Sequence, residues 1–354
     1  MAKINFSLTA DLDEVISAIE VTGQHVTNII ISEPGVGKSS ILKMLEEKHG
    51  DAYDYIYVDC PVKDMMDVAA SIPNHETKSL EYYVSSLFKL DSDKPKIIML
   101  DEFMKAPKLL SIIFTRLMLE RSVGDKPLPK GSIVFGTSNN TTDGVGDAML
   151  AHAGNRVCKI HMKKPNAEKW NAWAGANGVP RPIRAWVAMN PRALASYTDG
   201  DQDDNPYIFK PGMQGQFVSP RSLYLCGFYV SNKDKITPNM LAAGLAGTVG
   251  EAAAKSMAAF VQLEEKLIRF DEIVQRPDTV TVPEDVSALI MMMFEAVDSI
   301  KGQDDLTKYM TFVNRIRNTE VQAVFFTMMI RSKPRVARYN QAITKWAAEN
   351  HYVM

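Results

Sequence analysis

The stretch "IIISEPGVGKSSILKMLEEKHG", from Ile29 to Gly50, constrains the fold more than any other part of the chain. It starts with β-branched apolar residues, and such a run favours a β-strand. A loop with Gly35 and Gly37 follows. The next residues repeat apolar side chains at helical spacing, and Gly50 stands where that helix would end. The stretch therefore predicts a strand, a tight loop and a helix in succession, the unit of a parallel sheet covered by helices.

The loop carries most of a phosphate-binding pattern, G-x-x-x-x-G-K-[ST], with Ser32 in place of the first glycine. In such a loop, backbone N–H groups and a helix N-terminus point at the anion, and the lysine adds a point charge. Lys38 and Ser39 stand at the required spacing, and the Ser39 hydroxyl is an expected ligand of Mg²⁺. Ser32 falls where the strand ends, so a small residue suffices there. The alternative is a glycine-containing turn that binds no ligand. The residues predicted to bind ATP are Glu33, Pro34, Gly35, Val36, Gly37, Lys38, Ser39 and Ser40.

Two adjacent acids, Asp101 and Glu102, follow the apolar run "KIIML". We expect Asp101 to hold Mg²⁺ together with Ser39, and Glu102 to orient or deprotonate a water molecule. Taken alone, the pair is equally typical of two solvated acids at a strand end. Following a phosphate loop, with room for one strand between them, it indicates hydrolysis, because a simple phosphoryl-transfer kinase would not need Glu102.

The first half of the chain alternates short apolar runs with helical patterns, which predicts an α/β domain with a parallel five-stranded sheet. We place this domain at residues 1–165, because the pattern becomes mostly helical after Pro165. A helical domain is expected at 166–270 and a C-terminal helical extension at 271–354. A polar segment from Tyr197 to Gln216 is expected to be a surface loop. The predicted strands are Asn28–Ser32, Tyr55–Asp59, Lys96–Leu100, Ser132–Thr137 and Val157–Ile160.

Composition excludes several classes of function. The 354 residues carry a formal net charge of -2, so no global positive field favours nucleic acid. Three widely spaced cysteines suggest neither a zinc site nor a disulfide framework. The first residues do not have the pattern of a secretion signal, and no run of roughly 18 apolar residues predicts a membrane span. We therefore expect a cytoplasmic protein that does not enter a membrane.

The segment "LDEFMKAPKLLSIIFTRLMLERSVGDKPLPKGSIVFGTSNN" resembles the MoxR branch of the AAA+ ATPases. The family shares the acidic pair, the Ala-Pro helix start, the Leu-Pro hairpin and the strand that ends in Thr-x-Asn. The resemblance extends over roughly Leu12 to Leu225. It implies a P-loop AAA+ core followed by a helical lid, with Asn139 as the sensor 1 residue that contacts the attacking water or the γ-phosphate. Where the family has Asn and Arg after the acidic pair, this chain has Met104 and Lys105.

The resemblance also assigns two arginines. Arg156 stands just before a predicted strand, where the family carries an arginine finger that reaches the γ-phosphate in a neighbouring subunit. Arg221, in "FVSPRSLYL", matches the family's sensor 2 arginine on the lid. Arg121, at the end of the preceding helix, is a rival for the finger.

The family implies an ATP-hydrolysing ring, most often a hexamer, that remodels or assembles a protein partner in a chaperone-like way. The partner is commonly a protein with a von Willebrand factor A domain. Two other classes stay open. Basic segments such as "KYMTFVNRIRNTEVQ", in which aromatic residues are interleaved, would suit a nucleic-acid motor or a helicase loader. A scaffold that binds ATP without hydrolysing it is the third class, and Glu102 and Asn139 argue against it.

Overall fold

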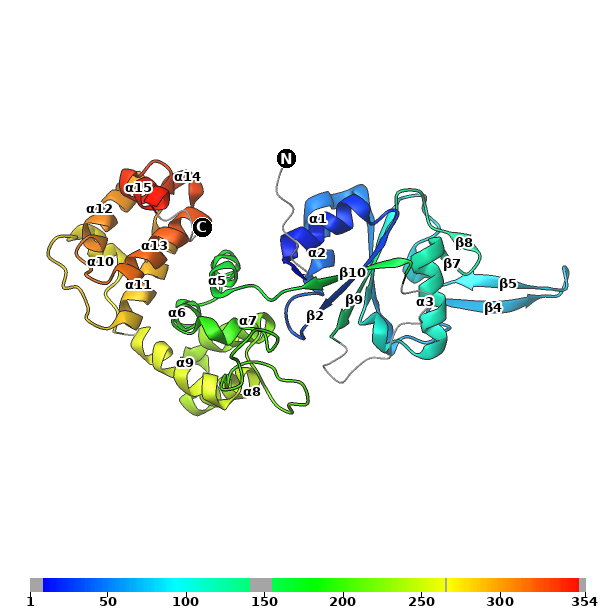
Figure 1. Cartoon of the computed structure of the whole chain (residues 1–354), viewed down its shortest axis with the longest axis horizontal. Helices are drawn as coiled ribbons and strands as arrows, with labels where there is room; N and C mark the ends of the chain where they lie inside the picture. The colour runs from blue at the N-terminus through cyan, green and yellow to red at the C-terminus, as the bar shows by residue number, and fades with distance from the viewer. Residues whose placement is uncertain (1–8, 141–154, 265, 350–354) are drawn as a thin grey trace. The chain divides into compact units, whose positions relative to one another are not determined.

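The computed structural model describes residues 9–140, 155–264 and 266–349. The chain forms two compact units (Figure 1). The first consists of Met1–Lys164 with Lys210–Met213, and the second of Pro165–Phe209 with Gln214–Met354. The predicted helical domain, 166–270, and the predicted extension, 271–354, both fall in the second unit apart from the short Lys210–Met213 segment. The division between them stays a prediction.

The first unit contains a parallel sheet, as predicted. Within the described residues this sheet has six strands in the order β1-β10-β2-β9-β6-β3, so the predicted count of five is wrong. The additional strand is β1, whose two residues pair with the end of β10 and are too few for a sequence pattern. The strands are β1 (Thr9–Ala10), β2 (Thr27–Ser32), β3 (Asp54–Asp59), β6 (Lys96–Asp101), β9 (Ile133–Asn139) and β10 (Val157–Met162).

Helices cover both faces of this sheet (Figure 1). Helices α1 (Leu12–Thr22) and α2 (Ser40–His49) pack on one face, against residues such as Ile30. Helix α3 (Lys108–Glu120) packs on the other face, where the neighbouring residues Ile29 and Ile31 point. Successive side chains of a strand point to opposite faces, so a strand covered on both sides needs an apolar run rather than an alternating pattern. The entirely buried strands β2, β6 and β9 have such runs at 29–31, 97–100 and 133–135, with their polar residues toward the strand ends.

The carboxyl ends of four strands meet at one edge of the sheet. Ser32 at the end of β2 pairs with Asn139 at the end of β9, and Asp59 at the end of β3 pairs with Asp101 at the end of β6. In open α/β sheets this edge is where ligands bind, because the loops to the helices leave from it. The polar residues at the ends of four apolar strands therefore lie side by side.

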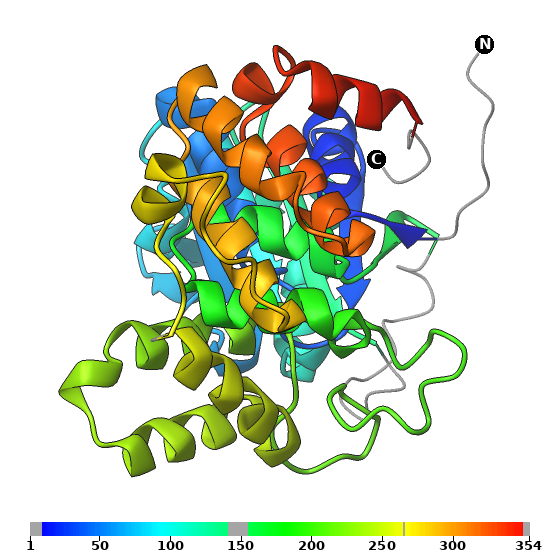
Figure 2. The ribbon, with the colours of Figure 1, turned by 90° about the vertical axis from the view of Figure 1, so that its left-hand side faces the viewer.

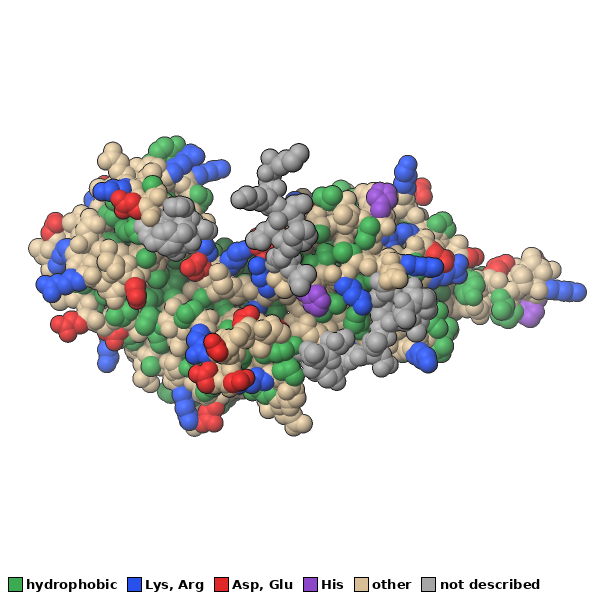
Figure 3. All heavy atoms as spheres, viewed as in Figure 1, with side chains coloured by type: hydrophobic (Ala, Val, Ile, Leu, Met, Phe, Trp, Pro, Cys, Tyr) green, Lys and Arg blue, Asp and Glu red, His purple; other side chains and the backbone are tan. Residues whose placement is uncertain are grey.

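The sequence pattern did not predict an antiparallel hairpin between β3 and β6. It consists of β4 (Ala69–Asn74) and β5 (Ser79–Val84), and most of its residues are exposed. Hydrophobic side chains lie on its surface, at the right of Figure 3. A second, very short hairpin joins β7 (Ser122–Val123) and β8 (Lys126–Pro127) after α3.

The second unit is helical, with one hydrophobic core. In Figure 2, α8 (Pro238–Val249, yellow-green) and α9 (Glu251–Glu264, yellow) lie side by side. In α11 (Val286–Ser299), every residue from 288 to 297 is buried, because α11 is the central helix of this core. The described helices of the second unit are α5 (Ala167–Ala176), α6 (Arg181–Met189), α7 (Pro220–Ser231), α8 (Pro238–Val249), α9 (Glu251–Glu264), α10 (Phe270–Gln275), α11 (Val286–Ser299), α12 (Gln303–Val313), α13 (Thr319–Ser332), α14 (Pro334–Ala337) and α15 (Gln341–Glu349).

None of the described helices of either unit is long and apolar enough to cross a membrane.

Candidate functional site

The predicted phosphate loop joins the end of β2 to the start of α2. Gly35 has a φ of 76° and Gly37 a φ of 109°. These angles lie in the region that side chains with a Cβ rarely adopt, so both positions favour glycine. Ser39 flanks α2 without a side-chain cap, which leaves its hydroxyl for another partner. The loop thus has the backbone of an anion site, with a helix N-terminus at its end.

The Lys38 ammonium is buried at this loop and surrounded by oxygen atoms. Its Nζ donates to the backbone oxygens of Ser32 (3.1 Å) and Glu33 (3.0 Å) and to the Ser32 hydroxyl (3.1 Å). It also donates to Asn139 Oδ1 at 2.8 Å, across 101 positions of sequence. A buried ammonium is tolerated only when acceptors satisfy it. The serine at position 32 therefore has a role that a glycine would lack, since its side chain helps to hold Lys38.

The Asp101 carboxylate accepts three hydroxyl hydrogen bonds. Ser39 Oγ donates to Oδ2 at 3.1 Å, and Tyr57 donates to the same oxygen at 2.7 Å. Thr137 donates to Oδ1. Burial and the neighbouring carboxylate of Asp101 raise the pKa of Tyr57, so this hydroxyl stays protonated and acts as the donor. The sequence predicted no role for the Tyr57 and Thr137 hydroxyls, because it does not show that their strands flank the strand of Asp101.

Glu102 follows directly, in a left-handed backbone conformation with a φ of 51°. Its backbone N–H donates to Thr137 Oγ1 at 3.2 Å, and its Oε1 accepts from Asn139 Nδ2 at 3.3 Å. Its other oxygen forms an ion pair with Lys105, from the short helical turn Phe103–Lys105. Asn139 thus links Lys38 to Glu102, and Lys105 is a further partner that the sequence motif did not assign.

Glu33 has its side chain directed to Lys164. Lys164 Nζ lies 2.9 Å from Glu33 Oε2, and both side chains are almost completely buried. Lys164 is the last residue before the second unit begins at Pro165. The Glu33 backbone oxygen accepts from Lys38, so Glu33 connects the loop lysine to the end of the first unit.

The two arginines assigned by resemblance and the rival Arg121 lie in different surroundings. Arg156 is exposed, in a turn directly before β10. Arg221 is exposed in the first turn of α7, in the second unit. Arg121 is engaged within its own chain: it donates to Thr27 Oγ1 at 2.6 Å, to the Gly23 carbonyl at 3.0 Å, and to the Met118 carbonyl. Burial lowers the pKa of Arg121. These hydrogen bonds therefore hold the C-terminal end of α3 against the first residue of β2.

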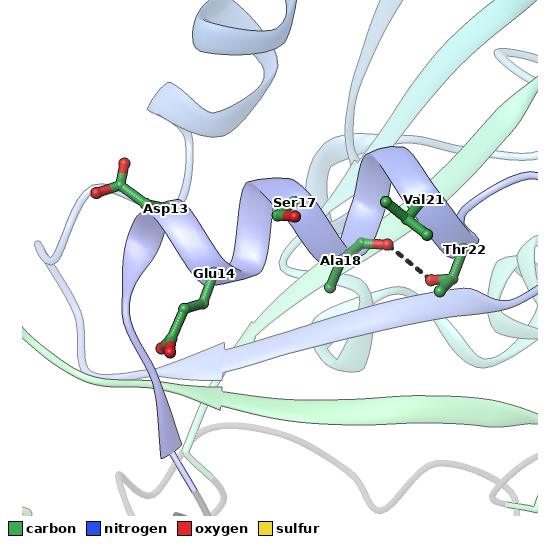
Figure 4. Close-up of a pocket in the computed structure, with 6 residues that line it drawn as sticks. All are labelled: Asp13, Glu14, Ser17, Ala18, Val21 and Thr22. Atoms are coloured by element: carbon green, nitrogen blue, oxygen red, sulfur yellow. Dashed lines mark hydrogen bonds between the residues drawn. The ribbon is translucent and has the colours of Figure 1, made fainter. Parts of the chain in front are cut away.

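Two other features bear on ligand binding. Among the described residues, no group of three or more His, Cys, Asp or Glu side chains is placed to hold a metal ion. A shallow depression lies on the surface of α1 (Figure 4), and none of the predicted site residues lines it. In it, the Thr22 hydroxyl donates to the Ala18 carbonyl at 2.7 Å. The lining residues are Asp13, Glu14, Ser17, Ala18, Val21 and Thr22.

Comparison with known proteins identifies no family. No family model matches the sequence. No curated protein matches it either. The chain is similar to solved structures that include a candidate ATPase from Cytophaga hutchinsonii, at 14% identity and a TM-score of 0.34. That alignment covers 69% of this chain and 83% of the other. The chemistry of the site therefore rests on its own residues.

Proposed function

We propose that this protein binds and hydrolyses ATP at the carboxyl edge of its parallel sheet. The observation that carries the proposal is the convergence there of Lys38, Ser39, Asp101, Glu102 and Asn139. The hydrogen bonds from Lys38 to Asn139 and from Ser39 to Asp101 bring residues far apart in sequence into one site. Together these side chains supply a cation for phosphate, oxygen donors for Mg²⁺, and a carboxylate and an amide that can orient water.

Lys38 and the loop backbone would bind the phosphates. A charged phosphate oxygen is a stronger acceptor than the amide oxygen of Asn139. ATP would therefore draw Lys38 Nζ away from Asn139, and the amide would become available to the attacking water. The N–H groups at the start of α2 would bind the remaining phosphate oxygens.

The donor set fits Mg²⁺. The Ser39 hydroxyl and the Asp101 carboxylate are hard oxygen donors that already lie together, at 3.1 Å. Mg²⁺ at phosphate sites is usually held by one or two protein groups, with phosphate and water completing its shell. Ser39 and Asp101 would hold the Mg²⁺ ion. When bound, the ion would neutralise part of the phosphate charge.

Glu102 is the proposed general base. Both of its carboxylate oxygens are engaged, one by Asn139 and one by Lys105. A carboxylate held by two donors is a poor base, because donors stabilise its charged form. Once Lys38 leaves Asn139 for the phosphates, Asn139 can turn from Glu102, and one oxygen becomes free to accept the proton of a water molecule.

We further propose a ring ATPase of the MoxR type within the AAA+ class, in which Arg156 of one subunit serves the site of the next. The exposed position of Arg156 before β10 supports this assignment over Arg121, whose guanidinium is held by its own chain. Arg221 would act as sensor 2 from the lid. The hexamer rests on the family resemblance.

The proposed partner is a protein, such as one with a von Willebrand factor A domain. The exposed hairpin supports a protein over nucleic acid. Its strands expose Ile72, Leu80, Tyr82 and Tyr83 and contain neither Lys nor Arg. Exposed large apolar side chains on one short element are typical of protein-binding surfaces, whereas a phosphate backbone requires positive charge. A cytoplasmic location also stays a prediction.

The test is Glu102→Gln, compared with Glu120→Gln, the same change at an exposed acid on α3. We expect Glu102→Gln to retain binding of Mg-ATP, to lose turnover by about 100- to 10,000-fold, and to assemble into a ring with ATP. Turnover and native mass measure the two effects. Unchanged turnover in Glu102→Gln, or unchanged ATP affinity in Lys38→Ala, would contradict the proposal. Strong stimulation by single-stranded DNA would favour the nucleic-acid motor.

A further inference from the structure

The hydroxyl of Tyr57 has no role in the chemistry proposed above, although it forms the shorter of the two hydrogen bonds at Asp101 Oδ2. Tyr57 lies on β3 and Thr137 on β9, the two strands that flank β6 in the sheet. Asp101, at the end of β6, therefore receives one hydroxyl from each neighbouring strand. The two hydroxyls bind different oxygens of the carboxylate, Tyr57 at Oδ2 and Thr137 at Oδ1.

This arrangement fixes the plane of the carboxylate. An ionised carboxylate has about four lone-pair positions, and donors held at both oxygens prevent rotation of the group. Without Tyr57, Oδ2 would keep only the longer bond from Ser39, which comes from the exposed end of the phosphate loop. Tyr57 contributes little to the hydrophobic core, because 45% of the residue is exposed. Its main contact is the hydrogen bond from its hydroxyl to Asp101.

We propose that Tyr57 is a positioning residue of the Mg²⁺ site, acting through Asp101. The proposal rests on the function proposed above. Groups that orient a metal ligand through hydrogen bonds typically change metal affinity by about 10- to 100-fold when they are removed. Tyr57 would act in this way, holding the Asp101 oxygens toward the Ser39 hydroxyl so that both meet the cation in one orientation.

The test is Tyr57→Phe, which removes the hydroxyl and keeps the ring. The control is Tyr55→Phe on the same strand, whose hydroxyl donates to the Gly50 carbonyl at 2.9 Å, away from Asp101. Binding of a fluorescent, non-hydrolysable ATP analogue is measured in EDTA and over a series of Mg²⁺ concentrations. This readout requires no turnover and separates metal binding from nucleotide binding.

We expect Tyr57→Phe to raise the half-saturating Mg²⁺ concentration by about tenfold or more, with unchanged affinity in EDTA and with Tyr55→Phe behaving as wild type. An Mg²⁺ dependence equal to that of wild type would overturn the inference and leave the proposed function intact. An equal loss of affinity in EDTA and in Mg²⁺ would also overturn it, since that result indicates a structural role. Failure of the wild-type protein to bind the analogue under either condition would refute the proposed function itself.

Discussion

Replacing Lys105 by methionine tests whether the ion pair to Glu102 restrains the proposed base. The two side chains are 22% and 32% exposed, so solvent screens their attraction. Ion pairs this accessible contribute about 0.5–1 kcal/mol. If the pair must open before Glu102 accepts a proton, its removal lowers the barrier by up to that amount. We therefore expect Lys105→Met to raise basal ATP turnover by about two- to fivefold.

Steady-state turnover at saturating Mg-ATP measures this effect. Lys105→Arg should behave close to wild type, because it keeps the charge. Lys108→Met removes an exposed lysine of the adjacent helix and should also leave turnover unchanged. A decrease in turnover in Lys105→Met, with nucleotide affinity retained, would refute the reasoning and indicate that the Lys105 charge assists the reaction.

Two further predictions concern ion pairs formed by buried lysines of the first unit. The hydrogen bond from the fully buried Lys96 holds the pKa of the Asp54 carboxyl below its ordinary value of 3.8. A carboxyl with a lowered folded pKa adds stability above its unfolded pKa and loses it as pH falls through the folded pKa. Asp54→Asn should therefore lower the free energy of unfolding at neutral pH. The difference in this free energy between the variant and wild type, measured by urea unfolding, should shrink below about pH 4. A difference that does not depend on pH would contradict this prediction. Glu33→Gln removes the carboxylate that pairs with the buried Lys164 and should lower stability by about 3 kcal/mol in the same assay, with partial recovery in the double variant Glu33→Gln/Lys164→Gln.

Local sequence predicted the five longer strands of the sheet and the helix after the phosphate loop. The helix predicted after Lys38 with its end at Gly50 is α2, and each predicted strand of the sheet lies within a few residues of an observed one. These predictions worked because each central strand contains an uninterrupted apolar run and the loop glycines have local conformational requirements. Strand β1 was missed because two residues carry no pattern.

The hairpin of β4 and β5 was missed for a different physical reason. Pro73 lies within β4, and proline argues against a strand because it cannot donate to a neighbour. A two-stranded hairpin has a free edge on each strand and tolerates it. The pattern was also weak because both faces are largely exposed, so the alternation of apolar and polar residues that marks a half-buried strand does not arise.

The sequence alone determined the parts of the site that are local: the phosphate loop, the helix that follows it, and an acidic pair at a strand end. Only the tertiary structure decided which of these residues meet. Strand β3 follows β2 along the chain, yet β9 and β6 lie between them in the sheet. This order places Asn139 beside Lys38 and Tyr57 beside Asp101. Strand order depends on how all the helices and strands pack together, and no local pattern encodes it.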